Sequence, residues 1–283
     1  MNIQVKKYSG DLVPFSEESL FKSLTNSGAS KHEAQQVYQQ IVKDLYSEIP
    51  TKELYEKAYK ALKEIKTSIA ARYSLKRALQ KLGPEGFYFE KWVAKIFETQ
   101  GFDAITGQIL EGKSKVTHEI DVVASNRKEN YLCECKFRND IDAKISVTTV
   151  MYFLARFVDL ESNQITFFNR AFIPTKGCLI TNAFFTSDSI LFANYYNIEL
   201  ISWNYPEEKS IKRLTDFYGL YPITCLTSLT DEEEQMLLSK NCILVRELIH
   251  NPVLLDHFKF EKDRKEIILK EAHELLNERI SNR

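Results

Sequence analysis

Three residues between positions 118 and 138 have side chains of the types that hydrolyse phosphodiesters. Asp121 lies in an apolar, strand-like run, and Glu134 and Lys136 lie in a second such run that follows a polar turn. Because residues two apart on a strand share a face, Glu134 and Lys136 point the same way. A hairpin between the two runs would bring Asp121 to them, so we predict that two carboxylates and an ammonium group converge at one point.

This set of groups suits metal-assisted cleavage of a phosphodiester. Two carboxylates form a hard oxygen site for Mg²⁺ or Mn²⁺, and the metal ion neutralises the charge that builds up on the phosphate. A neighbouring ammonium can orient the attacking water and stabilise the transition state. The alternative is a solvated cross-strand ion pair, which an isolated Glu-x-Lys tripeptide most commonly forms. The preceding aspartate, in an apolar strand of its own, favours the catalytic interpretation.

The residues around this set resemble a known family of nucleases. Asp121, a turn and then Glu134-Cys135-Lys136 form an arrangement similar to that of the PD-(D/E)xK nucleases. The preceding GFYFEKWVAKIFETQGF and the CECKFRN segment at the lysine look like the catalytic domain of Mrr-type restriction endonucleases. The resemblance implies a Mg²⁺-dependent deoxyribonuclease in which Asp121 and Glu134 bind the metal and Lys136 acts on the water. It also implies that the Cys135 backbone carbonyl is a metal ligand and that Glu90, on the preceding helix, has an accessory catalytic role.

Several basic residues could contact DNA. Residues 60–81 carry seven basic side chains against one acidic side chain, a local excess that suits contacts with the phosphate backbone. The same stretch could equally be a solvated helix face, and a histidine beside a strand could be a packed residue. The candidates for DNA contacts are His118, Arg138, Arg72, Lys76 and Arg77.

The first 82 residues resemble a second family, the ATP cone. The segments VKKYSGDLVPFSEESLFKSLTNSGAS, IPTKELYEKAYKAL and AARYSLKRAL carry this likeness. The resemblance implies a regulatory module that binds a purine nucleotide, ATP or dATP, as an allosteric ligand. The residues that it implies for this nucleotide site are Val5, Lys6, Lys7, Gly10, Lys22 and Thr51.

Two positions depart from the ATP-cone pattern. Tyr8 replaces an arginine and Ser19 replaces a lysine, and in the family such cations neutralise triphosphate charge. Lys6 and Lys22 could substitute for them. A cone with only a structural or dimerising role therefore stays open as an alternative.

The chain as a whole predicts an α/β multidomain protein with three parts. Residues 1–84 form a mostly helical ATP cone with a short β-hairpin, and Gly83-Pro84 marks its end. Residues 85–204 mix helices and strands as a restriction endonuclease-like α/β/α core. Residues 205–283 form a helical subdomain. Packing or dimerisation is its expected role, rather than a helix-hairpin-helix grip on DNA, since its turn at 239–241 lacks glycine.

Apolar spacing and turn residues predict the elements that position these sites. In the first part we expect strands at 2–8 and 11–15 and helices at 17–27, at 31–46, from a cap at Thr51, and at 68–82. In the second part we expect helices near 86–100, 146–160 and 186–194 and strands near 103–110, 116–124, 130–136, 176–181 and 197–202. A final amphipathic helix is expected within 259–283.

The composition excludes several classes of protein. The 283 residues include 38 lysines and arginines against 39 aspartates and glutamates, and the net charge of -1 excludes an indiscriminate basic DNA binder. With only 9 glycines and 7 prolines, the chain is neither collagen-like nor of low complexity. The five scattered cysteines suit free thiols in a reducing compartment rather than a disulfide or zinc framework. No signal peptide or spanning apolar run is evident, which favours a cytoplasmic location without a membrane partner.

Together these features predict a Mg²⁺-dependent endonuclease of the restriction or defence type that acts on double-stranded DNA. The ATP cone would sense a nucleotide and control a homodimer or higher homo-oligomer. A rival interpretation is a nucleotide-responsive DNA-binding regulator with an inactive nuclease fold, and the presence of Asp121, Glu134 and Lys136 counts against it. A third is a structure-selective nuclease that acts on DNA junctions.

Overall fold

The computed structural model describes residues 3–7, 10–140, 142–258, 260 and 262–277. The chain divides into two compact units: a first unit of Met1–Leu75 with Ile223–Arg283, and a second unit of Lys76–Pro222. These compact units divide at residues 75 and 222. The domain boundaries expected at residues 84 and 204 stay predictions, since compact packing and family boundaries need not coincide.

The second unit is built on a five-stranded mixed sheet with the order β12-β10-β6-β5-β4. Its strands are β4 (Asp103–Glu111), β5 (Thr117–Ser125), β6 (Asn130–Cys135), β10 (Lys176–Ile180) and β12 (Ile198–Ile201). β4, β5 and β6 form an antiparallel meander, whereas β6, β10 and β12 run parallel. The meander contains the hairpin predicted between the two apolar runs, which is thereby confirmed.

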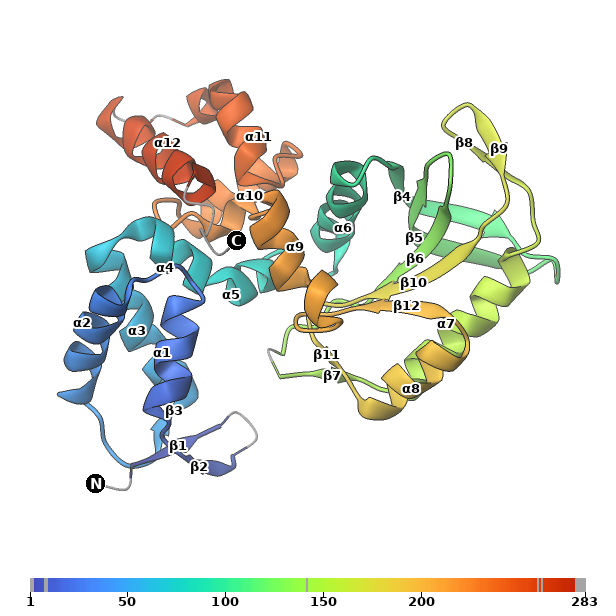
Figure 1. Cartoon of the computed structure of the whole chain (residues 1–283). Helices are drawn as coiled ribbons and strands as arrows, with labels where there is room; N and C mark the ends of the chain where they lie inside the picture. Colours follow the sequence, from blue (N-terminus) through green and yellow to red (C-terminus); the bar gives the residue numbers. More distant parts are fainter. Residues whose placement is uncertain (1–2, 8–9, 141, 259, 261, 278–283) are drawn as a thin grey trace. The chain divides into compact units, whose positions relative to one another are not determined.

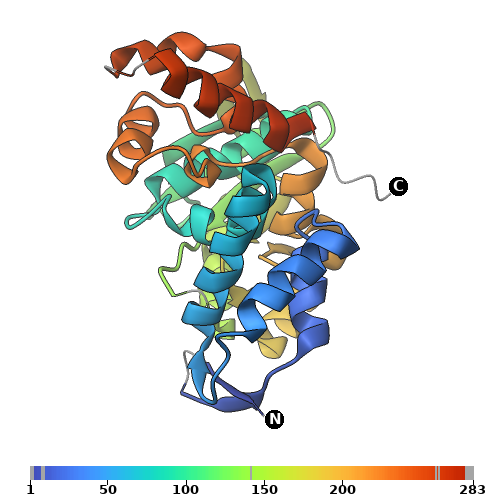
Figure 2. The same ribbon diagram turned by 90° about the vertical axis from the view of Figure 1, so that its left-hand side faces the viewer.

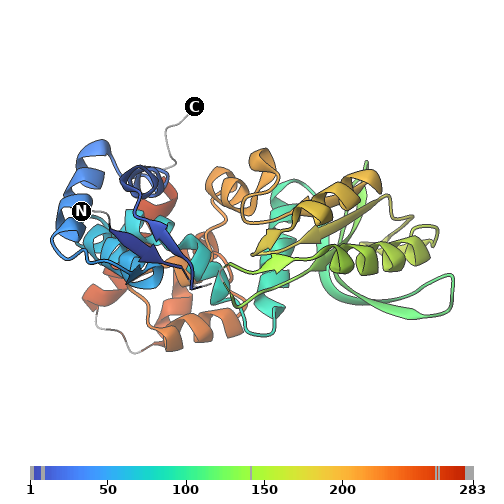
Figure 3. The same ribbon diagram turned by 90° about the horizontal axis from the view of Figure 1, so that it is seen from below.

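Helices cover both faces of this sheet (Figures 1 and 3). Helix α6 (Phe87–Thr99) packs against β4, β5 and β6. On the other face, α7 (Val147–Leu160) and α8 (Ser187–Tyr195) cover an apolar core that includes Leu132, Phe153 and Leu179. Helices on both faces confirm the predicted α/β/α arrangement. The side chains of β6 alternate between these faces and so meet both helical layers.

Gly107 interrupts the pairing of the edge strand β4 opposite Asp121. It has a left-handed φ of 63°, and the β4–β5 register runs from Thr106↔Val122 to Gln108↔Ile120 with no pairing at Gly107. A residue with a side chain would be strained in this conformation. The distortion therefore lies opposite the aspartate that the sequence singled out.

The second unit also contains short elements that have no individual prediction from the sequence. They are the pair β7 (Lys144–Ile145) and β11 (Phe184–Phe185), the hairpin β8 (Ile165–Phe167) and β9 (Arg170–Phe172), and helix α9 (Ile211–Tyr218). Helix α5 (Leu75–Gln80) lies within the helix expected over 68–82. Strands of two or three residues are too short to show a period of two. The segment after 204 is tied to this unit, because the Trp92 indole N–H donates to the Leu220 carbonyl at 2.8 Å.

The first unit combines a small sheet with helices from both ends of the chain. Its sheet has the order β2-β1-β3, from β1 (Gln4–Lys6), β2 (Leu12–Pro14) and β3 (Ile49–Pro50). Its N-terminal helices are α1 (Glu17–Thr25), α2 (Lys31–Val42), α3 (Thr51–Ile65) and α4 (Thr67–Tyr73). Leu24, Val37 and Leu62 are among the side chains that fill the core between them.

Two helix predictions in this part were wrong in detail. The helix expected over 68–82 is interrupted at Ser74, which ends α4 before α5 begins. Thr51 does not cap α3: Pro50 stands at the N-cap, and the Thr51 hydroxyl donates to the Lys6 carbonyl at 3.2 Å. A tertiary hydrogen bond to β1 thus takes the hydroxyl that capping would have used.

The C-terminal segment packs on the N-terminal helices of the first unit. Its helices are α10 (Asp231–Ser239), α11 (Val245–His250) and α12 (Lys262–Asn277), with single-turn segments at Ile223–Cys225 and Pro252–His257. α12 lies against α4 (Figures 1 and 2). The buried Glu271 accepts hydrogen bonds from the backbone N–H groups of Thr227 and Ser228, at 2.8 and 2.9 Å. Within the described ranges, none of the helices has the length and apolar character to cross a membrane.

We expect Glu271→Ala to lower the free energy of unfolding of the first unit by about 2 kcal/mol, because two backbone N–H groups lose a charged acceptor. Glu274→Ala on the same helix removes only a 4.0 Å ion pair with the exposed Lys270, so it should cost less than about 0.5 kcal/mol. Hydrogen–deuterium exchange over 223–277 measures both. Equal protection in the two variants would contradict the role of Glu271.

Candidate active site

The candidate active site lies where β5 and β6 separate. Their backbone pairing ends at Val122↔Cys133. One residue further, the Asp121 carboxylate accepts the Cys135 backbone N–H at 2.6 Å. The side chain of Asp121 thus replaces a backbone partner, and the hydrogen bond fixes the position of one carboxylate oxygen.

Glu134 is a buried charge held between two cations. Its side chain is 3% exposed; one carboxylate oxygen contacts the Lys136 ammonium, and the other lies 2.5 Å from the Arg156 guanidinium. A buried carboxylate needs such compensation, because desolvation of an unpaired charge costs several kcal/mol. Lys136 keeps 30% of its side chain exposed, so its ammonium joins the buried carboxylate to the surface.

The backbone around Lys136 is held by β10 and the residue after it. The Lys136 N–H donates to the Ile180 carbonyl at 2.8 Å, and its carbonyl accepts the Thr181 hydroxyl at 2.6 Å. The predicted convergence of Glu134 and Lys136 on one face therefore rests on parallel pairing with a strand 45 residues further along the chain.

Arg156 is the site residue that the sequence did not place beside Glu134. It comes from α7, 22 residues after Glu134, and only 12% of its side chain is exposed. A signal was present, because Arg156 is the only cation in the otherwise apolar helix VTTVMYFLARFVDL. A buried cation on a packed helix needs a partner of opposite charge.

Glu90 lies within the electrostatic field of the other carboxylates. Burial, followed by the negative charges of Asp121, Glu119 and Glu134, raises its pKa to about 7. Burial and the Glu134 charge likewise raise the pKa of Asp121 to about 6, against the lowering effect of the Cys135 N–H. Several carboxyl groups therefore share a partly buried space in which their charges repel one another.

These groups have the chemistry of a hard-cation site. Among the described residues, no set of three or more His, Cys, Asp or Glu side chains is placed to hold a metal ion. The protein donors would be the Asp121 and Glu134 carboxylates and the Cys135 carbonyl, with water completing the coordination. Mg²⁺ is commonly bound by one or two carboxylates and several waters, and a cation would offset the burial and charge repulsion that raise the pKa values of Asp121 and Glu90. The donor set fits Mg²⁺.

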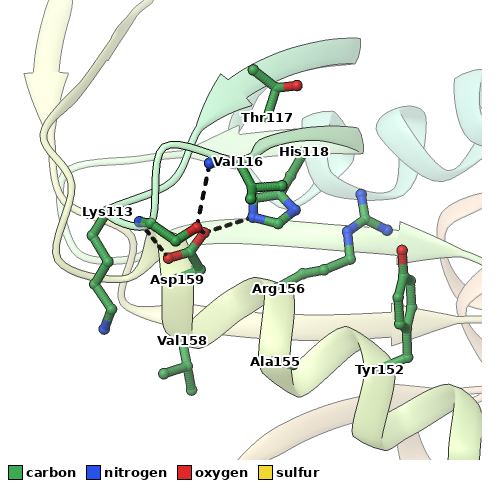
Figure 4. A pocket seen from close by; sticks show the side chains of 10 residues that line it. Lys113, Val116, Thr117, His118, Tyr152, Ala155, Arg156, Val158 and Asp159 are labelled. Carbon is green, nitrogen blue, oxygen red and sulfur yellow. Dashed lines mark hydrogen bonds and ion pairs between the residues drawn. The ribbon is translucent and has the colours of Figure 1, made fainter.

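A pocket of about 530 Å³ adjoins this site (Figure 4). It lies between residues 113–118 and α7, and Arg156, which pairs with Glu134, is part of its wall. His118 lines it too, with its Nε2 atom 2.8 Å from an oxygen of Asp159. Asp159 therefore orients the His118 ring. The expected contact between His118 and DNA stays a prediction.

The other candidates for DNA contacts are scattered. The basic stretch 60–81 is divided among α3, α4 and α5 and between the two units. Arg72 is buried and donates to the Leu275 carbonyl at 2.8 Å, so the expectation that it faces DNA is wrong. The Lys76 ammonium lies over the Phe184 ring at 4.1 Å, and burial lowers its pKa to about 8. Arg77 is in α5, and Arg138 donates its backbone N–H to Asn182 beside the site.

The structure brings several of the expected nucleotide residues together in the first unit. Lys6 and Lys7 are exposed at the β1–β2 turn, where Gly10 has a φ of 89° and donates its N–H to the Lys7 carbonyl at 2.9 Å. Thr51 reaches this turn through its bond to Lys6. The remaining expected residues are Val5, which is buried in β1, and Lys22, which is exposed on α1; Tyr8 lies outside the described residues.

Comparisons with known families match three segments of the chain. A family model described as an ATP cone domain matches residues 3–82, one described as a restriction endonuclease, of the Mrr catalytic type, matches 83–204, and one described as the C-terminal part of AF1548-like proteins matches 221–276. Both resemblances inferred from the sequence are thereby confirmed.

Individual relatives extend this result. An uncharacterised protein of Archaeoglobus fulgidus is 37% identical over 134 residues, which are 47% of this chain and 71% of the relative. The crystal structure of AF1548, a protein of unknown function, superposes with a TM-score of 0.55 and 29% identity, and covers 68% of this chain and 98% of the other. The chain therefore belongs to the family of the archaeal relative and combines an ATP cone domain with an Mrr-type restriction endonuclease domain.

Proposed function

We propose that this protein is a Mg²⁺-dependent DNA endonuclease of the restriction or defence type. One observation carries the proposal: Asp121, Glu134 and Lys136 converge where β5 and β6 separate, with Glu90 in their field. Raised pKa values of carboxyl groups that share a partly buried site are typical of functional centres. A set of groups kept only for stability would not gather repelling carboxylates in this way.

In this proposal each side chain has a distinct role. Asp121, Glu134 and the Cys135 carbonyl hold the metal, which when bound neutralises charge at the scissile phosphate. Lys136 donates an N–H of its ammonium to the attacking water and stabilises developing negative charge. Arg156 pairs with Glu134 and holds it in its buried position. Glu90, with a pKa of about 7, can accept the proton that the water releases.

The proposal includes nucleotide control through the ATP cone. Lys6, Lys7 and Lys22 are exposed cations that suit a triphosphate, and they offset in part the loss of cationic side chains at positions 8 and 19. ATP or dATP bound there would bias the nuclease through the fold or through association of subunits. A homodimer would present two nuclease sites to the two strands of double-stranded DNA.

Lys136→Ala is expected to lower the rate of plasmid cleavage in Mg²⁺ about 100-fold or more, because the ammonium at the attacking water is lost. Lys128→Ala, an exposed lysine in the turn of the same hairpin, is the matched control and should retain full activity. Branched and linear DNA are compared in parallel. Equal cleavage by the wild type and Lys136→Ala would overturn the catalytic assignment, and faster cleavage of junctions would favour the structure-selective nuclease.

Asp121→Asn is expected to stabilise the metal-free protein by about 3 kcal/mol at pH 8. The pKa of Asp121 is raised from 3.8 to about 6 on folding, so the folded state loses stability as the pH rises through this window. Asparagine removes that cost, and its advantage should disappear as the pH falls to 3.8. Thermal unfolding against pH measures it, and Mg²⁺ should stabilise the wild type but not the variant. A destabilised variant at pH 8 would refute the cost of burying the Asp121 charge beside Glu134.

Lys7→Ala and Lys22→Ala are expected to weaken the binding of ATP or dATP about 10-fold each, because each loses a charge-assisted contact with phosphate. Lys43→Ala, an exposed lysine after α2, serves as the control. Isothermal titration calorimetry on the full chain measures the affinities. Absence of binding by the wild type would remove nucleotide control and leave a structural cone.

A further inference from the structure

The pocket beside the carboxylates, here called the side pocket, has features that the cleavage reaction does not use. The residues that matter for its chemistry are Lys113, Ser114, His118, Tyr152, Arg156 and Asp159. Tyr152 and Arg156 stand one helical turn apart on α7 and project to the same side as His118 (Figure 4). The side pocket is therefore built from one face of α7 and the end of the β4–β5 hairpin.

The side pocket has an excess of positive charge. Asp159 is the one acidic residue that lines the side pocket, and both of its carboxylate oxygens already have hydrogen-bond partners in the protein. One accepts the Ser114 N–H at 2.9 Å; the other accepts the Ser114 hydroxyl at 2.6 Å and lies 2.8 Å from His118. Hydrogen bonds from Ser114 and His118 lower the pKa of Asp159 to about 2. The cations that line the side pocket are Lys113 and Arg156, and Arg156 also pairs with Glu134 through one guanidinium nitrogen. The remaining N–H groups of a guanidinium can meet an anion.

The walls of the side pocket are held in place before any ligand arrives. Besides the bonds to its carboxylate, Asp159 accepts the Lys113 N–H at its backbone carbonyl, at 2.9 Å. Gly112 lies so close that a Cβ atom there would collide with the Asp159 carboxylate. The hairpin is thus fixed to the last turns of α7, and binding need not order it first.

An aromatic side chain stands beside the cation. Tyr152 is 63% exposed, and the Arg156 guanidinium carbon lies 5.7 Å from its ring centroid. An exposed ring next to an arginine is the combination on which nucleobases stack while the arginine meets the phosphate. A base that remains paired and stacked in a duplex does not offer its face to such a ring, whereas an unpaired base does.

We infer that the side pocket binds one unpaired nucleotide of the DNA strand that is cleaved, with its base on Tyr152 and its phosphate on Arg156. This inference rests on the proposed nuclease function and deepens it. The volume of about 530 Å³ suits a group of the size of a nucleotide. Because the Arg156 guanidinium also lies 2.5 Å from Glu134, a phosphate on Arg156 lies next to the carboxylate site. The substrate class is therefore single-stranded DNA or duplex DNA with an extruded nucleotide.

The test measures binding of three fluorescein-labelled DNA oligonucleotides of one sequence by anisotropy. They are a single strand, a fully paired blunt duplex and a duplex with one unpaired nucleotide, and the full chain carries Lys136→Ala to prevent cleavage. Adding Tyr152→Ala is expected to weaken binding of the single strand and of the bulged duplex about 10-fold and to leave the paired duplex unchanged. Tyr152→Phe should retain the affinity. Tyr195→Ala, which removes an 82% exposed aromatic on α8, is the matched control and should have no effect.

Cleavage by the chain with Lys136 intact separates the inference from the proposed function. If DNA is cleaved but Tyr152→Ala binds all three oligonucleotides as before, the side-pocket inference is wrong and the nuclease stands. If binding depends on Tyr152 but no DNA is cleaved, the pocket is supported and the proposed function fails. Absence of binding to the single strand, or Tyr152-dependent binding of the matching RNA in place of the DNA, overturns the inference.

Discussion

The active-site half of the molecule depends on one constraint: the Glu134 carboxylate is buried and charged. At 3% exposure it cannot rely on water, so Lys136 from its own strand and Arg156 from α7 must both reach it. The pairing connects the end of β6 to the middle of a helix that covers the sheet. Because of this contact, the position of α7 and the positions of the candidate metal ligands depend on each other.

Two further carboxyl groups lie near the buried Glu134. Asp121 stands beside it with its carboxylate fixed by the Cys135 N–H, and Glu90 approaches from the opposite helical layer. Their mutual repulsion costs stability that packing elsewhere in the unit must offset.

The same helix face that provides Arg156 also forms the side pocket. Tyr152, Arg156 and Asp159 follow one another at helical spacing, and each meets a different partner: solvent, Glu134 and the hairpin. Helix α7 thus connects an exposed aromatic side chain to the buried carboxylate.

In the first unit, α12 likewise joins separate segments of the chain. Its Glu271 accepts hydrogen bonds from the segment 227–228, and its Leu275 carbonyl accepts a hydrogen bond from Arg72 of α4.

Local spacing alone determined much of this protein. The period-two placement of Glu134 and Lys136 and the preceding strand with Asp121 predicted the hairpin. Resemblance to known families, carried by longer sequence phrases, added the restriction endonuclease-like core and both family memberships. Only the tertiary structure decided the partner of Arg156, the burial of Arg72, the pocket next to His118 and the union of residues after 222 with the N-terminal helices. Periodicity reports which face of an element is apolar, but it carries no information on which distant element meets that face. Those pairings follow from desolvation and packing across tens of residues, which only the folded chain brings into contact.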